Sequence, residues 1–174
     1  CIRDRGEMVS LYAMAGQPDR ARDVLQAWEA EVDAPAHPRL SQQRAVVRAL
    51  IDAAEGGGES AVEAIEDAAR ELGCPRCFEM QKAVVLAQLE RFDEAIEIWE
   101  RVRDRPVLAE AGGFERTAAL VRLGALLEAT GNAQAAIEAH GALVAAWPDA
   151  DPELRAQVAR AQERIAALRG SPVP

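Results

Sequence analysis

Two cysteines, Cys74 and Cys77, form the only motif in this 174-residue chain whose residue types and spacing could do chemistry. The segment Cys74-Pro75-Arg76-Cys77 is expected to open a helix from about residue 76. A helix N-terminus with an adjacent arginine favours the thiolate form of a cysteine. Three interpretations follow: a structural pair, a reversible redox pair, and part of a metal site.

Each interpretation makes its own demand on the rest of the chain. A thioredoxin-type redox fold requires a preceding strand, but residues 62–70 have a helical pattern, which excludes that fold. A zinc site requires four ligands, and Cys1, His37 and His140 fall in other predicted hairpins, so a metal would have to be shared between two chains. A structural pair would be reduced in the cytoplasm or bridged outside it. No cofactor is predicted.

The elements that carry this motif follow from a phrase that occurs four times. Each copy has a turn-forming start, a short polar stretch, and an alanine five residues after the start. The starts are Gly16, Gly56, Glu90 and Gly131, and the alanines are Ala21, Ala61, Ala95 and Ala136. A unit of about 34 residues with variable loops is typical of an array of helical hairpins.

An amphipathic helix follows each of these alanines. Its buried face is predicted from residues at i, i+4 and i+7. The four faces are Ala21-Leu25-Trp28, Ala61-Ile65-Ala68, Ala95-Trp99-Val102 and Ala136-His140-Leu143. We expect His140 to be a packed, hydrogen-bonded core histidine rather than a ligand or base. About nine helices are predicted, at 2–15, 18–32, 39–54, 59–72, 76–89, 92–105, 113–129, 132–146 and 151–169.

Composition narrows the class of protein. Hydrophobic residues make up 49% of the chain and aromatic residues 4%, a mixture that favours helix over strand. The net charge of −9 disfavours a nucleic-acid ligand. No apolar run is long enough to span a membrane, and none resembles a signal peptide. Because the first residue is Cys, we expect a piece of a longer or processed chain; a cytoplasmic location is favoured, and an extracytoplasmic one stays open.

The segment from Leu89 to Glu100, Leu-Glu-Arg-Phe-Asp-Glu-Ala-Ile-Glu-Ile-Trp-Glu, resembles the tetratricopeptide repeat. The resemblance covers essentially the whole chain. It implies an all-α, right-handed solenoid with four hairpins, a C-terminal capping helix and a short frayed tail, forming one domain over residues 1–170. The predicted hairpins are 2–32, 39–72, 76–105 and 113–146, the cap is 151–169, and the tail is 171–174.

Two further segments, Cys74–Cys77 and Trp147–Leu154, are similar to the C-terminal repeat region of large bacterial signalling proteins. Those proteins carry a Ser/Thr kinase or a DNA-binding regulator at the N-terminus. The resemblance therefore implies a sensory or docking segment. The chain itself contains no kinase, phosphate-loop, nucleophile-elbow or metal-helix motif, so we predict a non-enzymatic protein.

In tetratricopeptide arrays the first helix of each hairpin lines a concave groove. The corresponding positions here are Val46, Leu50, Met80, Val84, Gln88, Val121, Ala125 and Glu128. This strip is mostly apolar and lacks the Lys, Arg and Asn clamp that grips a peptide carboxylate. This strip predicts that an amphipathic helix or an apolar segment, from a partner protein or from another domain of the same chain, occupies the groove. The alternative is that these side chains pack on one another.

Overall fold

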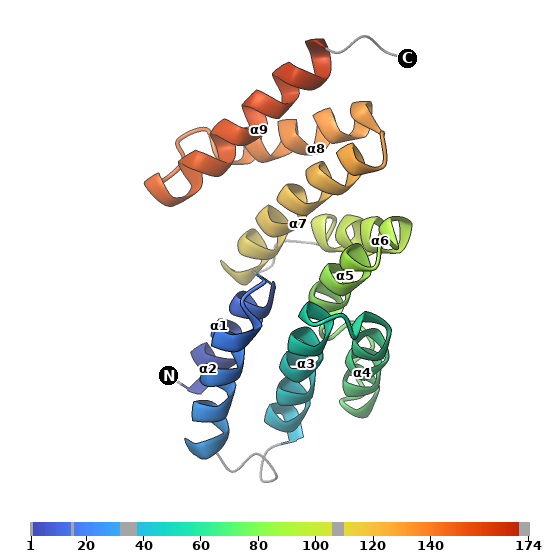
Figure 1. The fold of residues 1–174 in the computed structure, drawn as a ribbon. Helices are drawn as coiled ribbons and strands as arrows, with labels where there is room; N and C mark the ends of the chain where they lie inside the picture. Colours follow the sequence, from blue (N-terminus) through green and yellow to red (C-terminus); the bar gives the residue numbers. More distant parts are fainter. Residues whose placement is uncertain (1, 15, 32–37, 106–109, 171–174) are drawn as a thin grey trace. The chain divides into compact units, whose positions relative to one another are not determined.

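The computed structural model describes residues 2–14, 16–31, 38–105 and 110–170 (Figure 1). In these ranges the regular elements are nine α-helices, without a strand, and no helix is long and apolar enough to cross a membrane. The helices are α1 (Ile2–Met14), α2 (Pro18–Glu31), α3 (Pro38–Ala54), α4 (Gly58–Glu71), α5 (Glu79–Gln88), α6 (Phe92–Arg103), α7 (Glu110–Ala129), α8 (Ala133–Ala146) and α9 (Pro152–Gly170). The all-helical prediction is confirmed.

The four repeated phrases share one turn geometry. Gly16, Gly56, Glu90 and Gly131 all have positive φ, at 69°, 104°, 58° and 77°. Each of these residues donates its N–H to the carbonyl three residues back, and the next residue donates to the carbonyl five residues back. This pair of bonds ends a helix by satisfying its last carbonyls, and it requires a left-handed residue, which explains three of the glycines.

The predicted inner faces of α2, α4, α6 and α8 are confirmed, because every residue named for them is buried. The four alanines after the turns expose 1% of their surface or less. Four residues that stand seven positions before the turn starts, Val9, Ala49, Ala83 and Gly124, are also buried. Three of these four residues are alanine or glycine, and small side chains let packed helices approach closely.

The chain divides into two compact units, residues Cys1–Arg91 and Phe92–Pro174. In the first unit, α1 packs on α2 and α3, and α3 packs on α4 and α5. In the second unit, α7 packs on both α6 and α8, and α8 packs on α9. The division falls inside the predicted third hairpin, so α5 belongs to the first unit and α6 to the second.

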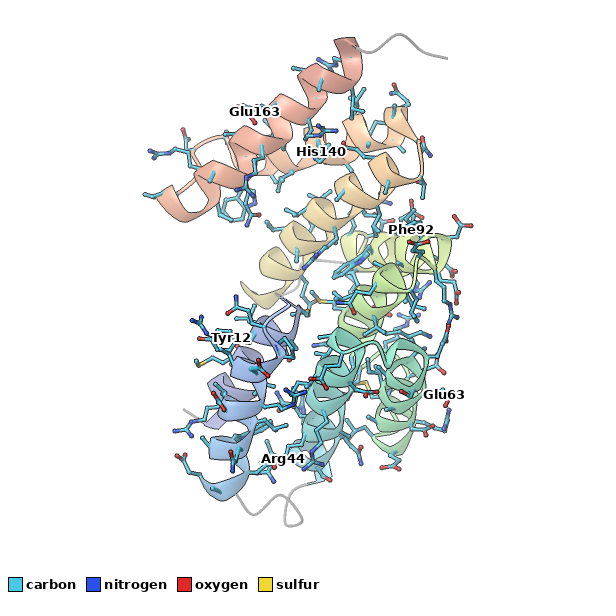
Figure 2. All side chains as sticks on the ribbon, viewed as in Figure 1. Tyr12, Arg44, Glu63, Phe92, His140 and Glu163 are labelled. Atoms are coloured by element: carbon cyan, nitrogen blue, oxygen red, sulfur yellow. A yellow bond between two sulfur atoms is a disulfide. The ribbon has the colours of Figure 1, made fainter. Side chains whose placement is uncertain are left out.

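Helix α3 is fixed to α2 in the first unit by a buried arginine. The Arg44 guanidinium donates to the Trp28 carbonyl at 3.2 Å and lies 5.1 Å from the centre of the indole ring. Trp28 itself is fully buried, and Arg44 exposes 7% of its surface. Figure 2 shows the Arg44 side chain on the ribbon. The indole ring and the carbonyl oxygen replace water around the guanidinium, and this offsets the cost of burying its charge.

Candidate functional site

A disulfide joins Cys74 and Cys77 in the turn between α4 and α5, with a Cα–Cα distance of 5.4 Å. The Cys74 N–H donates to the Ala69 carbonyl at 3.0 Å, and the Cys77 N–H donates to the Cys74 carbonyl at 2.9 Å. The prediction that a helix opens near residue 76 is wrong. Phe78 has φ 66° and α5 begins only at Glu79, because the closed turn and this left-handed residue interrupt the helix.

The metal interpretation of the cysteine pair depends on further ligands. Within the described ranges no group of three or more His, Cys, Asp or Glu side chains is placed to hold a metal ion. Cys1 and His37 lie outside the side chains that the structure describes. His140 is in the second unit and is bound to a carboxylate there.

The predicted groove residues of the first unit differ in accessibility. Val46, Leu50 and Val84 expose 1%, 3% and 8% of their surface, so they belong to the core of that unit. Met80 is half-buried and Gln88 is exposed. A partner could therefore reach the last two side chains without any rearrangement.

The predicted groove residues of the second unit also divide into packed and open positions. Val121 is half-buried and packs against a cluster formed by Leu120, Leu143 and Ala161. Ala125 is exposed. Glu128, the third predicted position, is engaged inside the unit as described next.

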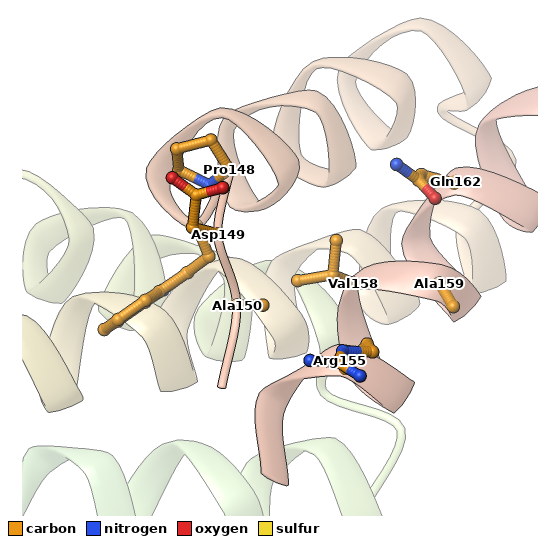
Figure 3. Close-up of a pocket in the computed structure, with 8 residues that line it drawn as sticks. Pro148, Asp149, Ala150, Arg155, Val158, Ala159 and Gln162 are labelled. Carbon is orange, nitrogen blue, oxygen red and sulfur yellow. The ribbon is translucent and has the colours of Figure 1, made fainter. Parts of the chain in front are cut away.

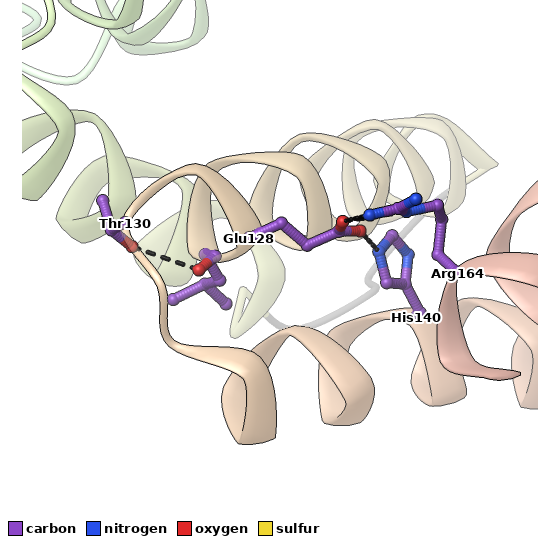
Figure 4. Close-up of polar contacts among 5 residues, drawn as sticks. Glu128, Thr130, His140 and Arg164 are labelled. Atoms are coloured by element: carbon purple, nitrogen blue, oxygen red, sulfur yellow. Dashed lines mark hydrogen bonds and ion pairs between the residues drawn. The ribbon is translucent and has the colours of Figure 1, made fainter. Parts of the chain in front are cut away.

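Glu128 lies at the centre of a polar contact that joins three helices (Figure 4). One carboxylate oxygen is 2.7 Å from Nε2 of His140 on α8, and the other accepts from Nε of Arg164 on α9 at 2.8 Å. The prediction of a hydrogen-bonded core histidine is confirmed, since His140 exposes 7% of its surface. Gly124 makes room for it, because a Cβ at that glycine would overlap the imidazole ring.

The charges around Glu128 favour its ionised form. The hydrogen bond from Arg164 lowers the pKa of the Glu128 carboxyl, burial opposes this, and the contact with His140 lowers the pKa further. The same hydrogen bond raises the pKa of Arg164. The other imidazole nitrogen, Nδ1 of His140, is buried and has no hydrogen-bond partner. The Glu128 carboxylate therefore links α7 to both α8 and α9.

Two hollows are both lined by Trp147, the residue that follows α8. The first, of about 450 Å³, is lined by the 147–150 segment and by Arg155, Val158, Ala159 and Gln162 of α9 (Figure 3). The second, of about 500 Å³, is lined by Trp147 together with residues of α7 and α8. These residues are Arg116, Thr117, Leu120, Ala142, Ala145 and Ala146.

The indole N–H of Trp147 donates to Oγ1 of Thr117 at 3.0 Å, which fixes the ring that lines both hollows. Trp147 is half-buried, unlike the fully packed Trp28 and Trp99. Three alanines in five residues, Ala142, Ala145 and Ala146, were the available signal, because small residues in one stretch of helix leave space beside a large ring.

Comparison with known proteins finds no match to a family model, to a curated protein or to a solved structure.

Proposed function

We propose that this chain is a non-enzymatic protein-interaction segment of a larger bacterial regulatory protein. Its hairpins would stack as a right-handed tetratricopeptide-like solenoid with α9 as the cap. The shared geometry of the four turns and the buried alanine after each turn support the repeat. The observation that carries the function is the hollow between α7 and α8, which is lined mainly by apolar side chains and open to solvent.

The proposed ligand is an apolar segment of a partner protein that reaches the hollow with one or two large side chains. Leu120 and Trp147 supply an apolar wall, and the alanines of α8 let a backbone approach closely. Arg116 stands at the same hollow, so an acidic residue beside the apolar anchor would fit. Of the predicted groove residues, Val121 and Ala125 lie on α7, the helix that also contributes Leu120 to the hollow.

A photo-crosslinking amino acid at Ala146 tests this proposal in cells of the parent organism. The control carries the same amino acid at Glu138, an exposed residue earlier on α8. We expect one partner to crosslink from position 146 and not from 138, through a peptide that contains large apolar residues. Adding Ala142→Arg should abolish the crosslink while the circular dichroism spectrum is unchanged. Equal crosslinking from both positions, or a crosslink that survives Ala142→Arg, would refute the proposal.

The disulfide supports a second candidate, a redox-responsive module. A dithiol reductant would supply two electrons and two protons, breaking the S–S bond and forming two thiols on the chain and one disulfide on the reductant. Because closing the turn interrupts the helix at 76–78, reduction would let α5 begin up to one turn earlier. Loss of the short crosslinked loop would cost about 2 kcal/mol of stability in the chain-entropy description.

Thiol counting and circular dichroism with and without reductant test this second candidate. We expect two additional thiols and a small gain in helical signal on reduction, both reversed by reoxidation. The double variant Cys74→Ser, Cys77→Ser should resemble the reduced protein in both conditions. A reduced chain with unchanged helicity and unchanged stability would leave the pair without a switching role.

A further inference from the structure

The first helix exposes two large apolar side chains, and at the position of one of them the other first helices carry buried residues. Met8 and Leu11 are the exposed large apolar side chains of the described residues, at 42% and 60% of their surface. They stand eight and five residues before the turn residue Gly16. At the five-residue position the other first helices carry Ile51, Val85 and Leu126, which expose 6%, 0% and 9%.

The eight-residue position faces the preceding hairpin in α3 and α5. Arg48 of α3 forms an ion pair with Glu29 of α2, and Lys82 of α5 forms one with Glu66 of α4. In each case the partner lies on the second helix of the hairpin before it. This face of a first helix is therefore the surface on which a preceding second helix packs.

Helix α7 carries apolar residues at both positions. Its residues at the two positions are Leu123 and Leu126, which expose 0% and 9%, and α6 packs on α7. The α6 helix is amphipathic, with Ala95, Ile98, Trp99 and Val102 buried. Met8 and Leu11 reproduce this apolar pair rather than the cations of α3 and α5.

We propose that the Met8–Leu11 face of α1 is a docking surface for the second helix of a further helical hairpin. That helix would pack on α1 as α6 packs on α7. The required helix is amphipathic, with apolar residues at i, i+3 or i+4, and i+7. It does not need an acidic residue opposite Met8. A second copy of this chain is a poorer occupant, because two side chains of one helix provide far less than the roughly 800 Å² per partner of a stable interface.

The inference rests on the repeat register of the proposed function but not on the hollow at Trp147, so the two can fail separately. Its test uses the full chain with Cys1→Ser and Leu11→Cys, the disulfide kept oxidised, so that the thiol introduced at position 11 is the reactive one. An extended version carries a copy of residues 79–109 ahead of α1, which supplies an α6-type helix and the natural α6–α7 connection. We expect alkylation of the introduced thiol to be at least tenfold slower in the extended chain.

Two controls make the result specific. Gln26→Cys on the exposed side of α2, made in place of Leu11→Cys, should alkylate at the same rate in both chains. Changing Ile98→Lys and Val102→Lys in the appended copy alone should restore fast alkylation at position 11. If the appended hairpin is helical but the thiol at position 11 is alkylated as fast as in the unextended chain, the proposal is overturned. An appended hairpin that stays unfolded would also count against it, because docking on α1 is what should bury its apolar face.

A dimer of the unextended chain would point to a different occupant. Sedimentation measures this directly over a range of concentrations. If the chain dimerises and Leu11→Lys makes it monomeric, the occupant is a second copy and the proposal is overturned. A monomer at all concentrations is the expected result.

Discussion

His140 occupies a position in α8 that a large apolar residue fills in α2, α4 and α6. Leu25, Ile65 and Trp99 follow the alanine of their repeat by four residues, as His140 follows Ala136, and all are buried. A histidine is tolerated there because Gly124 leaves space for the ring and Glu128 provides an acceptor. Gly124, His140 and Glu128 therefore form one packed cluster.

Gly124→Ala should disrupt this cluster of Gly124, His140 and Glu128. The new Cβ would lie closer than 3.0 Å to the imidazole, so His140 would have to move away from Glu128. We expect a loss of about 1–3 kcal/mol, as for other overpacked cores, measured by urea unfolding. The matched control is Gly141→Ala in α8, where a Cβ meets nothing within 4 Å. That variant should gain about 0.5–1 kcal/mol, because alanine is the better helix former.

Glu128 gives the second unit a defined pH dependence. Its pKa is lower in the folded protein than the ordinary value of 4.5, chiefly through the hydrogen bond from Arg164. The unfolded chain therefore takes up the proton at a higher pH than the folded chain. The stabilisation is complete above the unfolded pKa and is lost as the pH falls through the folded pKa.

Urea unfolding of wild type and Glu128→Gln between pH 7 and pH 3 measures this contribution. We expect wild type to be the more stable protein at neutral pH, and the difference to shrink as the pH falls below 4.5. Arg164→Gln should weaken the same pH dependence, since it removes the main cause of the shift. A difference that stays constant down to pH 3 would contradict this account.

At the scale of elements, the turn after α5 departs from its three counterparts. Glu90 adopts φ 58° where the other turns have glycine, and a side chain in that conformation costs roughly 1–2 kcal/mol. Glu90→Gly should therefore raise the free energy of unfolding by about 1 kcal/mol, net of the greater freedom of glycine in the unfolded chain. The reverse change, Gly131→Ala at φ 77° in open space, should lower it by a similar amount. Thermal or urea unfolding of both variants checks the pair.

The helices could be predicted from the sequence because each is bounded by a local signal. Turn glycines and the following alanines located α2, α4 and α8 to within about one residue. The start of α5 could not be predicted, since the left-handed Phe78 and the S–S bond reflect closure of the turn rather than helix propensity. The contact among Glu128, His140 and Arg164 could not be predicted either, because Arg164 is 36 residues from Glu128 in the sequence. Of its members, only His140 was predicted in its role, as a hydrogen-bonded core histidine.

At the scale of the whole molecule, the predicted single solenoid and the observed division into two units imply different cooperativity. Contacts cluster within residues Cys1–Arg91 and within Phe92–Pro174. A repeat array that acts as one domain would spread the effect of a local mutation along all its hairpins through their interfaces. Two separately stabilised units would confine it to the unit that carries the mutation.

Native-state hydrogen exchange on Gly124→Ala distinguishes these cases. Because Gly124, His140 and Glu128 all lie in the second unit, we expect amide protection to fall in α7, α8 and α9 by the same free energy that urea unfolding loses. Protection in α1 to α4 should stay within about 0.3–0.5 kcal/mol of wild type, as for independent sites. The converse variant, Val46→Ala in the core of the first unit, should lower protection in α1 to α4 and leave α7 to α9 unchanged. Equal losses in both units from either variant would mean that the chain unfolds as one cooperative array, and that the division within the third hairpin has no energetic counterpart.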